Sequence, residues 1–342
     1  MKAYILEKTG SLRENRRPLK LADMDLPAIG GEEVLIKISA CGVCHTELDE
    51  IEGRTPPPSF PMILGHQVVG KVARRGAQAN KFKINDRVGI GWIYSACGKC
   101  PRCLTGDENL CADFQATGRD THGGYAEYIK INQNFAFSIP EIFSDAQAAP
   151  LLCAGAIGYR SLRLAKLSDG QNLGLTGFGA SAHLVLKLSQ FLYPQSKIFV
   201  FARAERERNF SLELGAAWAG DTADEPPEKL QAIIDTTPAW KPVVEALKNL
   251  VPVGRLVINA IRKEEADKDY LLKLDYAKHL WEEKEIKSIA NVARRDIDEF
   301  LKFAAKIPII PEVEEYPLED ANRALTELKD GKIKGAKVLR ID

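Results

Sequence analysis

Residues 174–182 read Gly-Leu-Thr-Gly-Phe-Gly-Ala-Ser-Ala, and this stretch decides the fold of the middle of the chain. It lies between an apolar run and a helical pattern at 182–188, as a turn does between a strand and a helix. In that setting Gly177 permits a tight turn, Gly179 lets a pyrophosphate approach backbone N–H groups at the helix N-terminus, and Ala182 replaces the third glycine of the motif. The predicted dinucleotide contacts are Gly177, Phe178, Gly179 and Ala180.

The next predicted strand ends where the ribose of the dinucleotide would lie. Residues 197–203 have the apolar pattern of a strand and end on Ala202 and Arg203. An acidic residue there would bind both ribose hydroxyls of NAD and repel a 2′-phosphate, whereas a guanidinium can pair with a phosphate. Ala202 and Arg203 therefore favour NADP(H) as the cofactor. If Arg203 instead stacks on adenine or faces water, NAD(H) would serve equally well.

The segments around this motif alternate between helix and strand. The pattern starts near residue 151, and it includes predicted strands at 231–235, 255–259 and 286–289 and a helix at 242–248. Such alternation is typical of a parallel sheet with crossover helices, so the fold class is α/β.

The first part of the chain is predicted to be a compact, mostly β domain. Short segments rich in β-branched residues, separated by Gly, Pro and Asn, predict strands at 34–39, 70–73, 86–90 and 126–131. The end of the chain, with amphipathic helices at 296–306 and 319–330 and a strand at 337–341, is expected to return to this domain.

Four cysteines in this first part form the most specific motif of the sequence. They are Cys97, Cys100, Cys103 and Cys111. Four thiolates this close together, in a region rich in Gly, Pro and Asp, can surround one zinc ion and leave no position for a substrate, so we predict a structural zinc site. An iron–sulfur cluster and a pair of disulfides are the alternatives.

A second metal site is predicted from residues far apart in the sequence. Cys44 follows a predicted strand, His66 lies in a segment with Gly65 before it, and Cys153 follows Pro150 by three residues. A catalytic zinc takes three N or S ligands and keeps a fourth position open. Cys44, His66 and Cys153 are therefore the predicted catalytic ligands, although a buried cysteine is often only part of a core.

Composition limits the classes of protein to consider. The 342 residues predict two domains, and the 45% hydrophobic content fits a globular chain. Lys plus Arg equals Asp plus Glu at 47 each, which gives no basic surface for nucleic acid. No apolar run is long enough for a membrane span, and the N-terminus carries charge where a signal peptide would be apolar. Seven cysteines, four of them within fifteen residues, fit metal binding in a reducing compartment better than a disulfide framework, so we expect a cytoplasmic protein with small-molecule partners.

Together these residues resemble the zinc-dependent alcohol dehydrogenases of the medium-chain dehydrogenase/reductase superfamily, over nearly the whole chain. The resemblance implies a GroES-like, β-rich catalytic domain at 1–152 and 291–342, with the four cysteines in a lobe at about 95–113. It also implies a Rossmann domain, a doubly wound parallel sheet, at 153–290, and an active site in the cleft between the domains. A homodimer or homotetramer is expected, and the sheet edge at 256–260 could pair across a two-fold axis.

The resemblance implies reversible hydride transfer between a primary, or secondary, alcohol and NAD(P)⁺, with zinc as a Lewis acid on the substrate oxygen. Thr46 matches the hydroxyl that passes the alcohol proton to the nicotinamide ribose. His45 matches the position that faces the cofactor pyrophosphate; that it binds zinc itself is the alternative. Trp92 matches a bulky residue that, with Thr46, would favour unhindered primary alcohols, and a plain core tryptophan is the other interpretation. Cys41 could compete with Cys44 as a ligand or form a redox pair with it, but the family pattern implies that it is a bystander.

Three positions depart from the family pattern. Glu47 replaces the usual Asp, which changes the reach of a carboxylate expected to orient His66. Gln67 replaces the usual Glu and removes a negative charge near the metal. Asp49 stands where many members place the His that completes the proton relay; Asp49 could accept the proton, or it could be a solvated loop carboxylate.

Other functions fit part of the same pattern. A zinc polyol dehydrogenase would prefer a Glu near the metal, and a zinc-free quinone reductase would lack both the ligand cysteines and the four-Cys lobe. A non-catalytic zinc- and nucleotide-binding protein would bind both groups without turning over any alcohol or aldehyde.

Overall fold

The computed structural model describes residues 1–179, 181–331 and 335–341 of the chain. The chain folds into two compact units, unit 1 with Met1–Ala156 and Val292–Asp342, and unit 2 with Ile157–Asn291. The sequence predicts the boundaries at 152/153 and 290/291. The first boundary of the structure falls later because the π-helical segment η3 (Leu151–Gly155) runs directly into α4 (Ala156–Ala165), which places Cys153 in unit 1.

Unit 1 is built mainly from antiparallel strands. Its largest sheet has the order β10-β6-β5-β3-β18-β17, with β9 also paired to β3. These strands are β3 (Glu33–Val43), β5 (Val68–Arg75), β6 (Arg87–Ile90), β9 (Tyr128–Asn132), β10 (Phe137–Ser138), β17 (Val313–Pro317) and β18 (Ala336–Arg340). The smaller sheets contain β1 (Lys2–Leu6), β2 (Leu19–Asp23) and β4 (Met62–Ile63), and β7 (Ile93–Ser95) with β8 (Gln115–Ala116).

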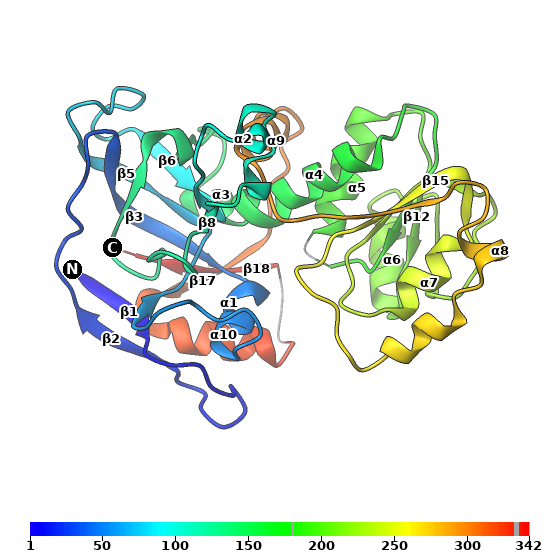
Figure 1. Cartoon of the computed structure of the whole chain (residues 1–342), viewed down its shortest axis with the longest axis horizontal. Coiled ribbons are helices and arrows are strands. Elements are labelled where there is room, and N and C mark those ends of the chain that lie inside the picture. Colours follow the sequence, from blue (N-terminus) through cyan, green and yellow to red (C-terminus); the bar gives the residue numbers. More distant parts are fainter. Residues whose placement is uncertain (180, 332–334, 342) are drawn as a thin grey trace. The chain divides into compact units, whose positions relative to one another are not determined.

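The end of the chain completes the main sheet of unit 1. Strand β18 pairs antiparallel with β3, so that Leu339 lies opposite Cys41 and Lys337 opposite Val43. Figure 1 shows this as a red strand beside blue ones. The predicted return of the C-terminal segment is confirmed, because the apolar residues of β18 are buried only when it lies in this sheet.

The helices of unit 1 pack by their apolar faces. They are α1 (His45–Ile51), α2 (Pro101–Leu104), α3 (Asp145–Pro150), α9 (Arg294–Lys306) and α10 (Ala321–Lys329), with the one-turn helices η1 (Glu108–Leu110), η2 (Gln133–Phe135) and η5 (Leu318–Asp320). In α9 the apolar residues Ile297, Phe300, Leu301 and Ala304 recur at helical spacing and are buried. Among the described residues, no helix combines the length and the apolar character needed to cross a bilayer.

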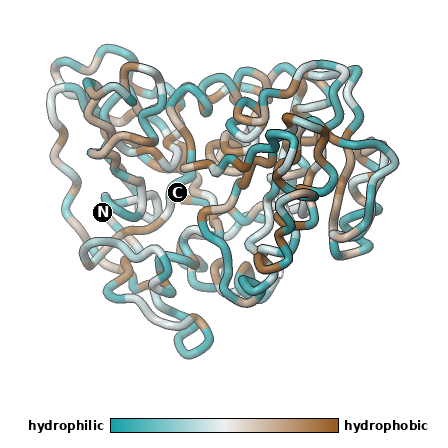
Figure 2. Tube along the Cα trace, turned by 45° about the vertical axis from the view of Figure 1, so that its right-hand side comes forward, coloured by the Kyte–Doolittle hydropathy of each residue, from teal (hydrophilic) through white to brown (hydrophobic). Residues whose placement is uncertain are grey.

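Unit 2 is a parallel sheet in the order β13-β12-β11-β14-β15-β16, which confirms the Rossmann prediction. The strands are β11 (Leu173–Thr176), β12 (Ile198–Phe201), β13 (Trp218–Gly220), β14 (Leu230–Asp235), β15 (Leu250–Ile258) and β16 (Glu285–Ser288). The helices are α4, α5 (Ala182–Leu192), α6 (Glu205–Glu213), α7 (Lys241–Leu247), α8 (Tyr276–His279) and η4 (Lys268–Lys273). In Figure 2 hydrophobic segments run through the interior, and the outer loops are largely hydrophilic.

The predicted sheet edge at 256–260 is wrong. Strand β15 is paired on both sides, with β14 and with β16. The edge strand is therefore β16, whose four residues are all exposed. Its sequence, Glu-Ile-Lys-Ser, is short and charged, as is common for edge strands, and this is why it gives a weaker sequence signal than the apolar β15.

Candidate functional site

Three side chains from separate parts of unit 1 meet at one point. The ligand atoms of Cys44, His66 and Cys153 all lie within 4.8 Å of one another. Of these atoms, His66 Nε2 and Cys153 Sγ are 3.2 Å apart. Zinc bonds of about 2.3 Å to sulfur and about 2.0 Å to nitrogen place the ligand atoms of a tetrahedral site about 3.5–3.8 Å apart. The three residues therefore fit one zinc ion with a fourth position left open.

The backbone around each of these residues explains how they meet. Cys44 is the N-cap of α1, directly after β3, and Cys153 lies in the π-helical segment η3. His66 lies in the loop between β4 and β5, after Gly65, whose φ is +96°. A Cβ on Gly65 would lie 2.5 Å from the Tyr125 ring, so glycine is required for the chain to pass there.

Glu47 fixes two members of this group. One carboxylate oxygen lies 2.6 Å from His66 Nδ1, and the other accepts the backbone N–H of Cys44 at 2.8 Å. Both the Glu47 and His66 side chains are buried. The expected contact with His66 is therefore present, because the longer Glu side chain still reaches the ring from the first turn of α1. With Nδ1 engaged, Nε2 is left for a metal.

The protonation of the group also suits a cation. A hydrogen bond from Cys153 lowers the pKa of the Cys44 thiol well below its usual value, and the same bond, with burial, raises the pKa of Cys153. Burial by itself lowers the pKa of His66, but the nearby Glu47 carboxylate and Cys44 outweigh it and raise that pKa. One sulfur is thus held as a thiolate, and the remaining protons are the ones that a bound metal displaces.

Removing the charge of Glu47 is expected to weaken metal binding at this group. Glu47→Gln should lower its zinc affinity by about 10- to 100-fold, because the carboxylate sets both the His66 ring and the Cys44 backbone. Competition with a chelator, followed by zinc content, measures this. Glu52→Gln is the matched control, since Glu52 ends the same helix and pairs with Arg54 and Lys329 instead. An unchanged zinc affinity in folded Glu47→Gln protein would contradict the assigned role.

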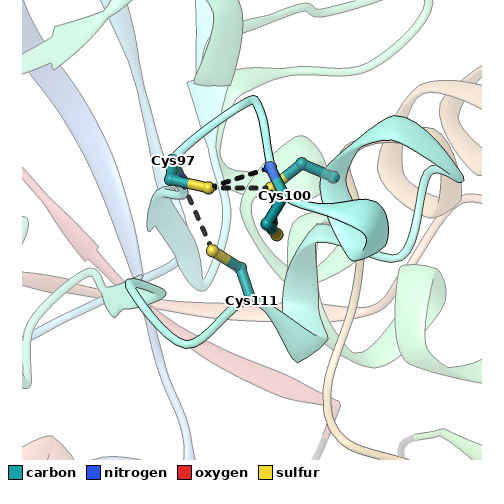
Figure 3. Close-up of side chains that lie close together, drawn as sticks. Cys97, Cys100 and Cys111 are labelled. Carbon is teal, nitrogen blue, oxygen red and sulfur yellow. Dashed lines mark hydrogen bonds between the residues drawn. The ribbon is translucent and has the colours of Figure 1, made fainter.

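The four-Cys lobe (residues 95–113) brings its sulfurs together in the same way. The ligand atoms of Cys97, Cys100, Cys103 and Cys111 lie within 4.8 Å of one another, and all four cysteines are free. Figure 3 shows Cys97, Cys100 and Cys111 pointing toward one another. The sulfur of Cys103 lies 3.9 Å from that of Cys97 and 3.6 Å from that of Cys100. These distances are too long for disulfides and fit the corners of one tetrahedral ion.

Backbone N–H groups prepare these sulfurs to carry negative charge. The N–H of Cys100 donates to Cys97 Sγ at 3.3 Å, and the N–H of Asp113 donates to Cys111 Sγ at 3.3 Å. Hydrogen bonds from the backbone of Lys99 and Cys100 lower the pKa of Cys97 to about 6. Burial raises the pKa of Cys103 to about 12, so this thiol needs a cation to lose its proton.

The other predicted residues of unit 1 lie close by. Thr46 Oγ1 is 3.8 Å from Cys44 Sγ. Trp92 is 3% exposed and stands edge-on to the His66 ring, with the ring centroids 5.1 Å apart. His45 is exposed and, within the described residues, belongs to neither metal group; nor does Cys41, which is fully buried.

The expectation of a solvated loop carboxylate at Asp49 is wrong. Asp49 lies in α1, is 4% exposed, and accepts a hydrogen bond from Arg54 Nε at 2.5 Å. The backbone N–H groups of Arg54 and Thr55 also bind its carbonyl oxygen. The sequence hides this arrangement because the pairing depends on the chain turning back after the helix ends.

In unit 2, the predicted turn lies between β11 and α5. Gly177 has φ +75°, and a Cβ there would lie 2.8 Å from Thr237 Cγ2. Gly179 faces open space, and Phe178 is buried. Ala180 lies outside the described residues. Ala202 follows β12 directly and is buried, and Arg203 is exposed beside it.

Arg208 is a residue of this region that the sequence does not reveal. Its Nη1 donates to the carbonyl oxygens of Ala202 at 2.8 Å and of Arg203 at 2.9 Å. It thereby fixes the loop that presents Arg203. Its position in a run of charged residues at 203–208 is typical of a solvated helix face, so no sequence signal separates it from its neighbours.

Related sequences match this chain over its whole length, and a family model matches part of it. A family model described as alcohol dehydrogenase GroES-like domain matches residues 30–141. The chain is 40% identical over 346 residues to a probable alcohol dehydrogenase, AdhA, of Mycobacterium tuberculosis, covering 100% of this chain and 97% of that protein. It is 32% identical over 351 residues to an alcohol dehydrogenase of Geobacillus stearothermophilus, covering 100% of both.

Solved structures match over the same length. The structure of CAD from Helicobacter pylori complexed with NADP(H) has a TM-score of 0.84 at 25% identity, covering 99% of this chain and 97% of that one. An NAD-dependent alcohol dehydrogenase has a TM-score of 0.87 at 21% identity, covering 100% of both chains, which is a likeness of fold.

Proposed function

Because the chain belongs to the zinc-dependent alcohol dehydrogenases of the medium-chain dehydrogenase/reductase superfamily, we propose that it transfers hydride reversibly between a primary or secondary alcohol and NADP(H). The chain is an oxidoreductase, and its substrates are small alcohols and the corresponding carbonyl compounds, as in that family.

The observation that carries the proposal is the group formed by Cys44, His66 and Cys153. Three N and S ligands would hold a catalytic zinc and leave one position open. When bound there, zinc supplies Lewis acidity that stabilises negative charge on the substrate oxygen during hydride transfer with the nicotinamide. Cys97, Cys100, Cys103 and Cys111 would hold a second, structural zinc.

We propose that Thr46 accepts the proton of the alcohol substrate. Its hydroxyl lies near Cys44 and, as both donor and acceptor, can take the alcohol proton while passing on its own. Asp49 lies three residues further along α1, and so on the same side of the helix, and it is the candidate acceptor for the next step. Arg54 holds that carboxylate in one orientation. His45, the exposed neighbour, is the candidate contact to the cofactor pyrophosphate.

Trp92 supports a preference for unhindered substrates. It is packed against the His66 ring and covered on one side by the Arg119 guanidinium, 5.5 Å from its ring centroid. A large ring held this firmly beside a metal ligand restricts the space for branched groups on the carbinol carbon. Among the proposed substrates, short or unhindered primary alcohols and their aldehydes are therefore expected to be preferred.

The test of this function measures oxidation of NADPH and, in parallel, NADH by zinc-replete protein, with acetaldehyde and benzaldehyde as substrates. We expect turnover with both aldehydes, faster with NADPH. Oxidation of a polyol by NADP⁺ or NAD⁺, without turnover of either aldehyde, would replace the proposal with a polyol dehydrogenase. Protein that holds zinc and binds the cofactor but turns over none of these substrates would support a non-catalytic binding protein.

The cofactor preference is proposed to depend on Arg203. Arg203→Gln should raise the Kd for NADPH by about tenfold, the size expected for a lost charge-assisted hydrogen bond, and leave that for NADH nearly unchanged. Nicotinamide fluorescence on titration measures both. Arg206→Gln is the matched control, because Arg206 is an arginine of the adjoining helix. If Arg203→Gln weakens both cofactors equally, or neither, Arg203 does not select the 2′-phosphate.

A further inference from the structure

A buried ion pair lies in unit 2, where the predicted cofactor turn after β11 meets the end of the neighbouring strand β14. Asp235 is the last residue of β14 and is fully buried. Its carboxylate accepts hydrogen bonds from Thr176 Oγ1 at 2.6 Å and Thr237 Oγ1 at 2.8 Å, and it forms an ion pair with Lys263. Thr176 is the last residue of β11, so this carboxylate joins the ends of two neighbouring strands.

Lys263 comes from the segment that follows β15, and its ammonium group is fully used. Besides Asp235, Nζ donates to the carbonyl oxygens of Thr237 at 2.8 Å and Ala239 at 3.0 Å. Its side chain is 8% exposed. An ammonium group has three N–H donors, and here they go to three separate acceptors, two of them backbone groups of the loop between β14 and α7. Lys263 therefore determines the shape of that loop, residues 236–240.

The same segment holds the far end of the loop. Asp267 accepts the backbone N–H of Trp240 at 2.9 Å and that of Lys241 at 2.8 Å, at the start of α7. The positively charged Lys263 thus binds carbonyl oxygens of loop 236–240, and the negatively charged Asp267 binds N–H groups at the start of α7. Each charge is opposite to the partial charge of the backbone groups that it contacts.

Loop 236–240 in turn forms one side of the Gly177 turn. Thr236 donates its backbone N–H and its hydroxyl to the carbonyl oxygen of Thr176, at 2.9 and 3.0 Å. If Gly177 carried a Cβ, the two atoms nearest to it would be Thr237 Cγ2 and Thr236 Oγ1, at 2.8 and 3.0 Å. The turn and the loop therefore pack against each other without space for a side chain.

This position is where an open α/β sheet binds its ligand. The strand order of unit 2 reverses between β11 and β14, and ligands of such sheets lie at the carboxyl ends of the strands beside that reversal. Thr176, Asp235 and the loop 236–240 are at this point. The hydrogen bonds of the ion pair therefore act on the walls of the proposed dinucleotide site.

We propose that Lys263 and Asp235 are positioning residues for the dinucleotide, which hold loop 236–240 against the Gly177 turn in the shape that binds the cofactor. This inference rests on the proposed function, because it takes the turn to be the cofactor site. The ion pair joins β11 and β14, whereas Arg203 follows β12, and so the pair acts on the part of the cofactor that NADPH and NADH share. Its loss weakens both cofactors by the same factor.

The test uses zinc-loaded full-length protein and the variants Lys263→Met, Lys263→Arg and Asp235→Asn, with NADPH and NADH titrated by nicotinamide fluorescence. We expect Lys263→Met and Asp235→Asn each to raise both Kd values by about tenfold or more, since each leaves a buried charge without its partner. Lys263→Arg keeps the positive charge but replaces the compact ammonium group with a larger, planar guanidinium group. We therefore expect it to raise the two Kd values by less than Lys263→Met does. In turnover measurements, we expect the variants to raise the KM for the cofactor more than they lower kcat.

Lys268→Met is the matched control, because Lys268 lies in the same part of the chain and pairs with Glu265 on the surface. Thermal unfolding reports whether each variant is folded, and Lys263→Arg replaces Lys263→Met if the latter does not fold. Folded variants with Kd values within twofold of the unaltered protein, or a loss confined to NADPH, would overturn the inference while leaving the proposed function intact. Failure of the unaltered protein to bind either cofactor would overturn both.

Discussion

The Cys153→Ala variant is expected to lose at least about a thousandfold of turnover and one zinc ion per chain, while it keeps the other zinc. Cys153 is the third proposed protein ligand, and its sulfur lies 3.2 Å from His66 Nε2. Two ligands cannot hold zinc against water as three do, and the loss of Lewis acidity, worth about 4 kcal/mol or more of barrier, corresponds to this factor. Aldehyde-dependent NADPH oxidation and zinc content per chain measure the two effects.

Cys41→Ala provides the matched control for this prediction. Cys41 is a fully buried cysteine of the same unit, and it lies outside both metal groups of the described chain. Its replacement should leave two zinc ions per chain and change turnover by no more than about threefold, because only a small packing loss is involved. The assignment of Cys153 fails if its variant keeps both zinc ions, or if Cys41→Ala loses one.

The sequence could predict those features that a short stretch encodes completely. The four-Cys lobe has its ligands within fifteen residues, and the Gly177 turn has its strand, turn and helix in one continuous segment. Strands β3 and β12 are recognisable because their alternation or apolar character is set by burial in a sheet. For these elements the local pattern and the fold agree, which is what makes a sequence interpretable.

Features that bring together distant segments of the chain are harder to predict from the sequence. Cys44, His66 and Cys153 could be predicted as a group only because each residue type is chemically suited to zinc and the whole pattern resembles a known family. The Asp49–Arg54 pair and the Asp235–Lys263 pair have no comparable signal, since a charged residue on a surface and one in a buried pair look alike in sequence. Lys263 in particular lies in a charged run, 262–265, that resembles a solvated loop.

The four-Cys lobe has little hydrophobic core of its own. Leu104 is 74% exposed and Leu110 is 46% exposed, while Cys103 and Cys111 are among the buried residues. The helical pieces α2 and η1 are single turns, which are not stable alone in water. We therefore expect the proposed zinc ion to be the main source of order in the lobe, as in small zinc-binding domains that unfold without their metal.

The lobe is also connected to the segment that carries Cys153. Glu108, in η1, accepts a hydrogen bond from Arg294 Nε at 2.6 Å, and Arg294 is the first residue of α9 (Figure 1). Along the same helix, Phe300 packs so closely on η3 that a Cβ added to Gly155 would lie 2.0 Å from its ring. Disorder in the lobe would release the N-terminus of α9 and loosen the packing behind Cys153.

Loss of one lobe ligand should therefore destabilise unit 1 strongly. In the Cys111→Ala variant we expect one zinc ion per chain and a fall in Tm of about 8–16 °C, since a loss of even about 4 kcal/mol has this effect in a domain of this size. Zinc content, thermal unfolding and limited proteolysis at 95–113 measure these effects, with Cys41→Ala as the control for a buried Cys-to-Ala change.

Glu108→Gln separates the contribution of the metal from that of the Glu108–Arg294 contact. It removes this contact and keeps the four cysteines, so its effect on Tm should be smaller and its zinc content unchanged. A Cys111→Ala protein that has lost one zinc yet unfolds at the normal temperature would show that the metal does not hold the lobe together.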